Sequence, residues 1–400
     1  MDYEKEIKEA RERISGTVHN TPLIYSYRLS EMTGVNVYLK LESLQRTGSF
    51  KIRGAYNKLC RISDKKNNVI AASAGNHAQG VALAAKLLGI KATLVMPEGT
   101  PINKILAVKQ LGADIVLNGL NFEDAFGHAV ELGEKNNFTF IHPFDDYDVI
   151  YGQGTIGLEI SEKLNKIDAV LVPVGGGGLI AGIALSCRSA GRGIKIYGIE
   201  SENVPAMSLS LKNNQITMPP PGTSLADGIA VKKVGEIAFS IIRENVEDVT
   251  TVNESEIEDS LLILSQQKKL VVEGAGAVGL AGLIRQKDKF RNKNVVIVVS
   301  GGNIDVNVLA KIIDRGMVKS GRLMRLEIEL PDIPGALGML SSLLGELRAN
   351  IIHIFHDRLS KGLPLGKAIV ELTLETRDFD HQEEIIKQLR GNNYNPGKQG

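Results

Sequence analysis

The 400-residue sequence contains no tryptophan, only two cysteines and almost no excess of charge. Cys60 and Cys187 are far apart in the chain, which excludes a disulfide framework or a cysteine-rich metal site. The 47 basic and 46 acidic residues give a net charge of +1, so nothing attracts nucleic acid or an anionic membrane overall. The charged N-terminus lacks the apolar core of a signal peptide, and Pro173 with several glycines interrupts the longest apolar stretch, 169–185. We therefore expect a cytoplasmic protein without nucleic-acid or membrane partners.

The length and the alternation of short apolar runs with longer helical patterns indicate an α/β protein of two or three domains. Parallel sheets flanked by helices are expected, with ligands bound beyond the carboxyl ends of the strands. Small-residue clusters follow three of these runs, at 73–75, 175–178 and 300–302. The predicted strands are Val69–Ala72, Thr93–Met96, Ile115–Leu117, Ala169–Val172, Lys195–Ile199 and Val295–Val299, and the helices between them include 77–89, 102–111, 121–135 and 179–190.

The pattern changes near the glycines at 316 and 321, which predicts a linker over 316–321 between a domain of residues 1–315 and a smaller one of residues 322–400. The smaller segment predicts the order strand, helix, two strands and helix (322–330, 336–349, about 350–358, about 366–374 and about 379–390). The last ten residues have almost no apolar alternation. We therefore expect the final strand of this α+β domain to be missing or supplied differently.

Lys51 lies at the predicted start of a helix over 51–62, between an aromatic and a β-branched residue. Most lysines are solvated surface charges, but burial and the positive helix end would lower the pKa of this amine. A partly neutral amine can form an imine or act as a base. By itself the segment leaves both interpretations open.

Two further segments predict anion binding. In the segment 72–80, ASAGNHAQG, backbone N–H groups beside a helix start suit a carboxylate or phosphate, and His77 is a base or a structural residue. In the segment 172–182, VPVGGGGLIAG, four glycines let the backbone approach a phosphate. Gly176, Gly178 and Ala181 also match a dinucleotide-binding fingerprint, with Glu200 ending the next strand. A nicotinamide-dependent dehydrogenase is therefore an alternative function, although it gives Lys51 no role.

Ser300 follows an apolar strand in SGGNID (300–305), where its hydroxyl could bond a heterocyclic nitrogen or simply cap a helix. Taken in order, KLESLQRTGSFKIRGA (40–55), SAGNHAQG, GGGGL and SGGNID resemble the threonine dehydratases, which are pyridoxal-phosphate enzymes of the tryptophan-synthase-β-like class. This resemblance spans roughly residues 1–315. It implies fold type II, in which a small subdomain of about residues 43–145 is inserted in a larger one. Residues 322–400 resemble an ACT domain, a regulatory module that binds amino acids.

The resemblance implies a role for each matching position. Lys51 would carry pyridoxal 5′-phosphate as a Schiff base and take the Cα proton of the substrate. Phe50 would border the cofactor ring, Asn76 would hydrogen-bond its 3′-oxygen and Ser300 would face its nitrogen. The phosphate would be bound by Gly175, Gly176, Gly177, Gly178 and Leu179. The substrate carboxylate would be bound by Ser73, Ala74, Gly75, Asn76 and His77.

Departures from related enzymes narrow the expected activity. Ala74 stands where serine racemases have a serine that serves as the second base, so racemisation should be poor. The racemase metal site needs two carboxylates, and Glu200 matches one while Ala206 stands at the other, so no metal is expected. We expect ammonia to be eliminated from L-threonine to give 2-oxobutanoate, with L-serine as a slower or as the main substrate, an amino acid or a nucleotide as effector, and a homodimer or homotetramer. A non-enzymatic amino-acid sensor is a further alternative.

Overall fold

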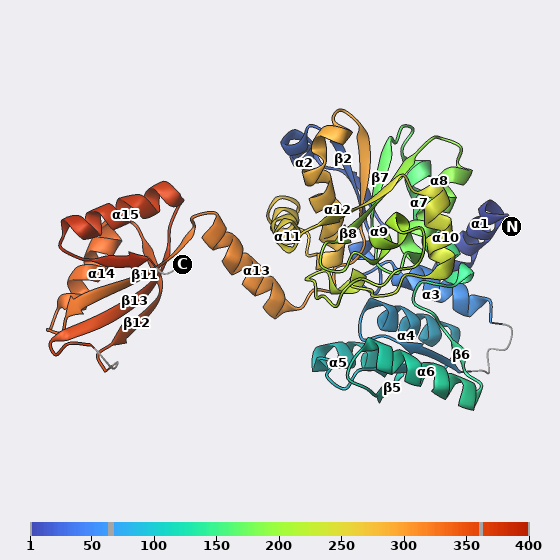
Figure 1. Ribbon diagram of the computed structural model, residues 1–400, viewed down its shortest axis with the longest axis horizontal. Helices are drawn as coiled ribbons and strands as arrows, with labels where there is room; N and C mark the ends of the chain where they lie inside the picture. Colours follow the sequence, from blue (N-terminus) through green and yellow to red (C-terminus); the bar gives the residue numbers. More distant parts are fainter. Residues whose placement is uncertain (1, 63–67, 360–362, 399–400) are drawn as a thin grey trace. The chain divides into compact units, whose positions relative to one another are not determined.

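The computed structural model describes residues 2–62, 68–359 and 363–398, which form two compact units, 1–304 and 305–400. The first unit contains two sheets (Figure 1). The larger has the order β1-β2-β10-β7-β8-β9, antiparallel only between its first two strands. Its strands are β1 (Leu23–Tyr25), β2 (Asn36–Leu41), β10 (Asn294–Val299), β7 (Ala169–Pro173), β8 (Lys195–Ser201) and β9 (Asp248–Val252).

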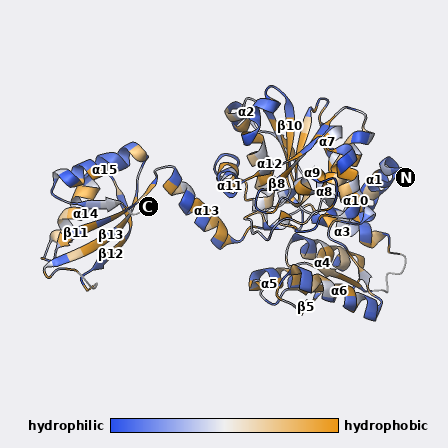
Figure 2. Ribbon diagram, in the orientation of Figure 1, coloured by the Kyte–Doolittle hydropathy of each residue, from blue (hydrophilic) through white to orange (hydrophobic). Residues whose placement is uncertain are grey.

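The larger sheet is buried on both faces. Along β10, Val296 and Val298 belong to the core cluster that includes Ile180 of α8. Ile297 between them points the other way, against Gly279 of α12. All three side chains are fully buried, and the strands are coloured as hydrophobic in Figure 2. Period-two alternation between two covered faces explains why the strand is a continuous apolar run. The helices of this layer are α1 (Tyr3–Ile14), α2 (Tyr27–Thr33), α7 (Tyr147–Lys163), α8 (Gly178–Ser189), α9 (Ala206–Lys212), α10 (Glu236–Asn245), α11 (Glu254–Lys268) and α12 (Gly274–Arg285), with short 3-10 turns at Glu42–Leu44, Asp227–Ile229 and Lys287–Phe290.

The smaller sheet is entirely parallel, with the order β5-β4-β3-β6. On β3, Val69 and Ala71 face the cluster that contains Ala82 of α4, whereas Ile70 faces Ala129 of α6. The elements are α3 (Lys51–Cys60), β3 (Val69–Ala72), α4 (Asn76–Leu88), β4 (Ala92–Met96), α5 (Ile102–Gln110), β5 (Asp114–Leu117), α6 (Phe122–Asn136) and β6 (Thr139–Phe140). The predicted α/β class with parallel sheets flanked by helices is confirmed.

The second unit begins with helix α13 (Val306–Lys319), which continues through Gly316, where the sequence predicts a linker. An antiparallel sheet with the order β12-β13-β11-β14 follows, and its apolar face packs on two helices. Its elements are β11 (Leu323–Pro331), α14 (Ala336–Glu346), β12 (Asn350–Asp357), β13 (Lys367–Glu375), α15 (Phe379–Gly391) and β14 (Pro396–Lys398). This strand order and the β-α-β-β-α-β sequence are ferredoxin-like.

The expectation about the last strand of this unit is wrong. Residues Pro396 to Lys398 pair antiparallel with Ile328 to Leu326 of β11 and close the sheet. An edge strand is held by backbone hydrogen bonds along one side, so it needs no apolar alternation, and a proline is tolerated there. Residues 399 and 400 lie outside the described part of the chain.

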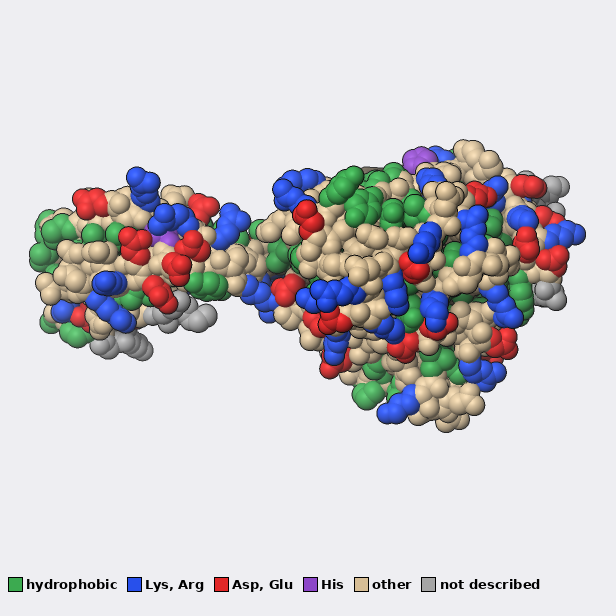
Figure 3. All heavy atoms as spheres, turned by 90° about the horizontal axis from the view of Figure 1, so that it is seen from above, with side chains coloured by type: hydrophobic (Ala, Val, Ile, Leu, Met, Phe, Trp, Pro, Cys, Tyr) green, Lys and Arg blue, Asp and Glu red, His purple; other side chains and the backbone are tan. Residues whose placement is uncertain are grey.

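No helix among the described residues is long and apolar enough to cross a membrane. On the face drawn in Figure 3, basic and acidic side chains are interspersed within each unit.

Candidate active site

The segment before α3 is joined to the loop that follows β10. Ser49 and Gly301 form an isolated antiparallel bridge, and the Phe50 N–H donates to the Ser300 carbonyl at 3.2 Å. Gly302 donates in turn to the Gly48 carbonyl at 2.8 Å. Through these bonds the structure brings together two motifs that are 250 residues apart in the sequence, with Ser300 2% exposed. Lys51, the first residue of α3, therefore follows directly on a segment fixed to the end of β10.

The ε-amine of Lys51 donates to the Pro143 carbonyl at 2.9 Å and lies 5.2 Å from the centre of the Phe50 ring. Burial lowers the pKa of Lys51 to about 8, against the opposing effect of the Glu273 carboxylate. A measurable fraction of the amine is therefore neutral near physiological pH, as nucleophilic and base chemistry require.

The glycine run after β7 is closely packed against neighbouring backbone. A Cβ on Gly178 would lie 2.6 Å from the Phe144 carbonyl oxygen, and one on Gly175 would lie 2.9 Å from the Ile229 Cα. Gly177 has a φ of +96°, and a Cβ on Gly176 would lie 2.4 Å from the Phe144 ring. The run ends at the N-terminus of α8, whose second residue is the buried Leu179. Backbone N–H groups without neighbouring Cβ atoms and a helix N-terminus form an anion-binding arrangement that suits the phosphate of pyridoxal phosphate.

The segment 73–77 is the third part of the candidate site, after the Lys51 segment and the glycine run. Ser73 Oγ accepts the Gly75 N–H at 3.1 Å, and the half-buried Ala74 packs on the smaller sheet's core. His77 is buried, with Nε2 2.9 Å from the Ile141 carbonyl. Burial, helped by the charge of Lys51, lowers the pKa of His77 to about 3. The imidazole is therefore neutral and donates to that carbonyl, which favours a structural role for this side chain.

Asn76 is held at both ends of its amide. Its Nδ2 donates to the two carboxylate oxygens of Glu273 at 2.7 and 3.0 Å. Its Oδ1 accepts from Asn303 Nδ2 at 2.7 Å. Sequence reasoning missed Glu273, and although Asn303 lies inside the quoted SGGNID motif it was not singled out. An acidic residue between an apolar run and a glycine-rich helix start was the only signal for Glu273.

The loop after β6 was also missed. His142 Nδ1 accepts the N–H groups of Asp145 at 2.8 Å and Phe144 at 3.3 Å. Burial lowers the pKa of His142 to about 4, so this ring stays a neutral acceptor. The Asp145 carboxylate accepts three backbone N–H groups at the start of α10. This loop thus fixes Pro143, the partner of Lys51, and Phe144, the neighbour of the glycine run.

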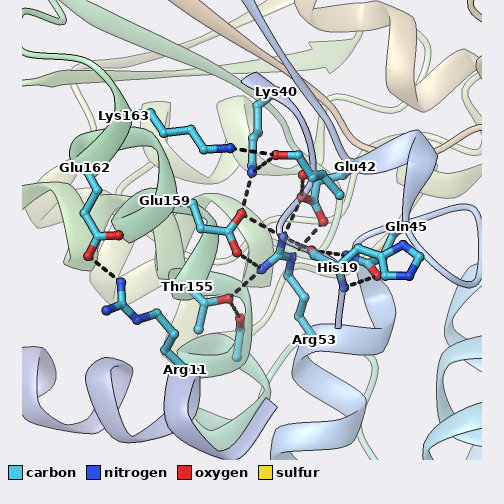
Figure 4. Close-up of polar contacts among 12 residues, drawn as sticks. Arg11, His19, Lys40, Glu42, Gln45, Arg53, Thr155, Glu159, Glu162 and Lys163 are labelled. Carbon is cyan, nitrogen blue, oxygen red and sulfur yellow. Dashed lines mark hydrogen bonds and ion pairs between the residues drawn. The ribbon is translucent and has the colours of Figure 1, made fainter. Parts of the chain in front are cut away.

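A buried charge network lies behind α3 (Figure 4). The guanidinium of Arg53 donates to both carboxylate oxygens of Glu42, at 2.8 Å each, and to both of Glu159, at 2.7 and 3.0 Å. Lys40 also bonds Glu159. These side chains come from β2, the turn after it, α3 and α7, and the network therefore fixes the helix that begins with Lys51.

Glu200 has a different task from the one the dinucleotide fingerprint assigns to it. Its carboxylate accepts the N–H groups of Met207 at 2.7 Å and Ser208 at 3.0 Å, at the start of α9. Burial raises the pKa of Glu200 to about 7. Within the described residues no group of three or more His, Cys, Asp or Glu side chains could hold a metal ion.

Two sheets of mainly parallel strands, whose loops bring together a half-buried lysine, a glycine loop suited to an anion and a buried serine, define a cofactor enzyme of fold type II. The chain belongs to the pyridoxal-phosphate dependent enzymes, because the family of that description matches residues 14–301.

Curated relatives and solved structures agree with this family. The chain is 49% identical to L-threonine ammonia-lyase of Thermotoga maritima, over 98% of each protein. It is 47% identical to L-threonine ammonia-lyase of Geobacter sulfurreducens, over 97% of each. A processed threonine deaminase isoform of Solanum lycopersicum is 40% identical, with a TM-score of 0.75 over 79% of this chain and 88% of that one. Maize serine racemase is 33% identical, with a TM-score of 0.74 over 79% and 98%.

Proposed function

We propose that the protein is a threonine ammonia-lyase that converts L-threonine to 2-oxobutanoate and ammonia, with L-serine converted to pyruvate more slowly. The observation that carries this proposal is the position of Lys51, whose buried amine has a lowered pKa and lies among the loops that suit the cofactor. The identity of 47% and 49% with enzymes named for L-threonine, over nearly the whole chain, supports the choice of substrate.

Bound pyridoxal phosphate supplies an aldehyde that condenses with amines and a ring that withdraws electrons from the substrate Cα. The glycines 175–178 and Leu179 bind its phosphate through backbone N–H groups at the start of α8. Phe50 would border the ring, and Ser300 would face the ring nitrogen. A neutral hydroxyl there would leave that nitrogen largely unprotonated, which would favour elimination. Asn76 would donate to the 3′-oxygen.

Substrate is oriented by its carboxylate, which the N–H groups and Ser73 hydroxyl of segment 73–77 bind. Lys51 Nζ takes the Cα proton and returns it to the β-hydroxyl, which leaves as water. The released enamine takes up water and loses ammonia to give the 2-oxo acid. Ala74 has no proton to transfer, so Lys51 is the base for this step and elimination is favoured over racemisation.

We also propose that residues 1–315 form the catalytic part, with a small subdomain of about 43–145, and that 322–400 form an ACT domain that binds an amino-acid effector. The ferredoxin-like sheet of the second unit and the separation of the chain into two compact units, 1–304 and 305–400, support a division in this part of the chain. A homodimer or homotetramer in the cytoplasm completes the proposal.

The test is 2-oxo acid formation by purified protein from L-threonine and from L-serine, with and without L-isoleucine. A yellow protein that turns over threonine faster than serine is expected. Turnover that needs a nicotinamide cofactor and occurs without bound pyridoxal phosphate would contradict the proposal. Ligand binding without ammonia release would favour a sensor.

A further inference from the structure

Glu273 lies at the start of α12, where its side chain is enclosed by three other loops of the first unit. It is 6% exposed, and its carboxylate accepts Asn76 Nδ2 on both oxygens. A Cβ on Gly301 would lie 2.1 Å from Oε1, and one on Gly228 would lie 3.6 Å from it. The carboxylate therefore reaches Asn76 through a space that the missing side chain of Gly301 leaves, while a Cβ on Gly228 would make only an ordinary contact.

The contacts of Asn76 determine which way its amide faces. Asn303 Nδ2 donates to Asn76 Oδ1 at 2.7 Å and to the Thr47 carbonyl at 2.8 Å, which fixes Asn303 as the donor. The Glu273 carboxylate, which is an acceptor, takes the nitrogen end. An amide nitrogen carries two hydrogens, and one hydrogen shared between the two Glu273 oxygens accounts for both contacts. The second hydrogen can then be donated to a bound ligand.

We propose that Glu273 is a positioning residue that acts through Asn76, because its carboxylate and Asn303 together fix the amide with an N–H directed at the cofactor's 3′-oxygen. This inference rests on the proposed function, in which Asn76 contacts that oxygen. Without the acceptor at 273, the amide could turn and present its carbonyl oxygen, which would repel an ionised 3′-oxygen.

Charged groups around Glu273 make this orientation dependent on pH. Burial raises the pKa of Glu273 to about 7, the hydrogen bond from Asn76 opposes the rise, Asp227 adds to it, and Lys104 with the Asn303 N–H opposes it. Lys51 also faces this carboxylate. Below pH 7 the group becomes a carboxylic acid, which can donate as well as accept, so the amide loses its fixed orientation. Cofactor binding should weaken as the pH falls through that value.

The experiment is a double-mutant cycle read out by the dissociation constant of pyridoxal phosphate and by the absorbance of the bound cofactor. Glu273→Met and Asn76→Ala should each weaken binding about tenfold, the size expected for one hydrogen bond. The double variant should bind no more weakly than Asn76→Ala, because Glu273 acts through Asn76. If the double variant weakens cofactor binding by the product of the two single factors, the two residues act independently and the proposal is overturned.

Glu254 provides a matched control. Its half-buried carboxylate accepts hydrogen bonds from the Ser201 and Ser224 hydroxyls and from the Leu225 N–H, just before the 3-10 turn Asp227–Ile229. Glu254→Met should lower the melting temperature, and any loss of cofactor binding should be independent of Asn76→Ala. An equal dependence on Asn76 in this control would show that the coupling is general loosening and would overturn the role of Glu273.

If Glu273→Met does not fold, Glu273→Gln carries the test. Its amide keeps an acceptor but does not titrate, so the weakening of cofactor binding that Glu273 adds near pH 7 to the titration of Lys51 should disappear. A wild-type pH profile with the same shape as that of Glu273→Gln overturns the proposal. Wild-type protein that binds no pyridoxal phosphate would instead refute the proposed function, so the two failures are distinguishable.

Discussion

Lys51 Nζ donates to the carbonyl of Pro143 at 2.9 Å, across 92 positions of sequence. Pro143 belongs to the loop in which His142 accepts two backbone N–H groups and Phe144 packs against the glycine run. One short loop therefore fixes both the candidate nucleophile and the candidate phosphate site. The acceptor is an uncharged backbone carbonyl that does not titrate, so the pKa of the lysine itself decides its reactivity.

The capture of cofactor by protein stripped of it should depend on pH in a defined way. Only the neutral amine attacks an aldehyde, and burial lowers the pKa of Lys51 to about 8 from its usual 10.5. The rate should rise about tenfold per pH unit below 8 and level off above it. Stopped-flow absorbance measures this profile. A rate that continues to rise to pH 10 would indicate an ordinary lysine.

Substitution in the glycine run should affect cofactor binding more than substitution of a helical glycine with open space around it. Gly178→Ala places a Cβ 2.6 Å from the Phe144 carbonyl oxygen, a backbone atom that cannot move freely. We expect a loss of about 1 to 3 kcal/mol in stability and at least about tenfold weaker cofactor binding. Gly127→Ala in α6, where no atom lies within 4 Å of the added Cβ, is the control and should be neutral or stabilising by up to ~1 kcal/mol. Equal effects in both variants would contradict the close-packing argument.

The buried network behind α3 should be sensitive to the shape of its cation as well as to its charge. Arg53→Lys keeps the charge but cannot reproduce the four bonds that the guanidinium makes to Glu42 and Glu159, which leaves a buried carboxylate poorly paired. Urea denaturation should show that the free energy of unfolding falls by about 3 kcal/mol. The exposed pair Arg11–Glu162, also drawn in Figure 4, is the control, and Arg11→Ala should cost less than about 1 kcal/mol. A loss for Arg53→Lys as small as that of the control would refute the prediction.

The same network predicts how stability changes with acid. Burial acts to raise the pKa of Glu42, but the charge and hydrogen bonds of Arg53 outweigh it and the pKa is lowered. The stabilisation by Glu42 is therefore fully present above its unfolded value of about 4.5 and is lost as the pH falls through its lower, folded value.

Ala74 should limit the enzyme to elimination. Its methyl group carries no transferable proton, so wild-type protein should leave D-serine unchanged while it deaminates L-serine. Ala74→Ser adds a hydroxyl to the loop that binds the substrate carboxylate and should introduce exchange of the α-hydrogen of D-serine in deuterium oxide, measurable by NMR. Wild-type protein that interconverts L- and D-serine would contradict the assignment of Lys51 as the only base.

Local sequence patterns predicted the elements whose burial is visible in their own apolar residues. The run at 295–299 is apolar at every position because helices cover both faces of β10, and it was predicted as a strand. Strand β2 was not predicted, and it contains the buried Lys40, which bonds Glu159 on α7 and the Thr21 carbonyl. That pairing is a tertiary contact and leaves no local pattern. The final strand was predicted wrongly for a related reason, since β11 supplies its partners.

Some residues of the candidate site could be predicted from the sequence and others could not, for the same reason. The glycine run and the segment around Ser300 could be found because small-residue clusters follow predicted strands there, and the Lys51 segment was found through its resemblance to the threonine dehydratases. Pro143 contributes a backbone carbonyl, which no side-chain pattern reveals. Glu273 acts beside Asn76 across 197 positions, and only the packing of α12 against the strand-end loops brings it there.

The most direct test of the account is reduction of the purified, yellow protein with borohydride, followed by peptide mapping. We predict that the pyridoxyl group is fixed on Lys51 alone, in the peptide that contains TGSFKIRGA, and that Lys51→Ala protein remains unlabelled and does not release ammonia from L-threonine. Unmodified Lys51 after reduction of an active, yellow preparation would contradict the central claim.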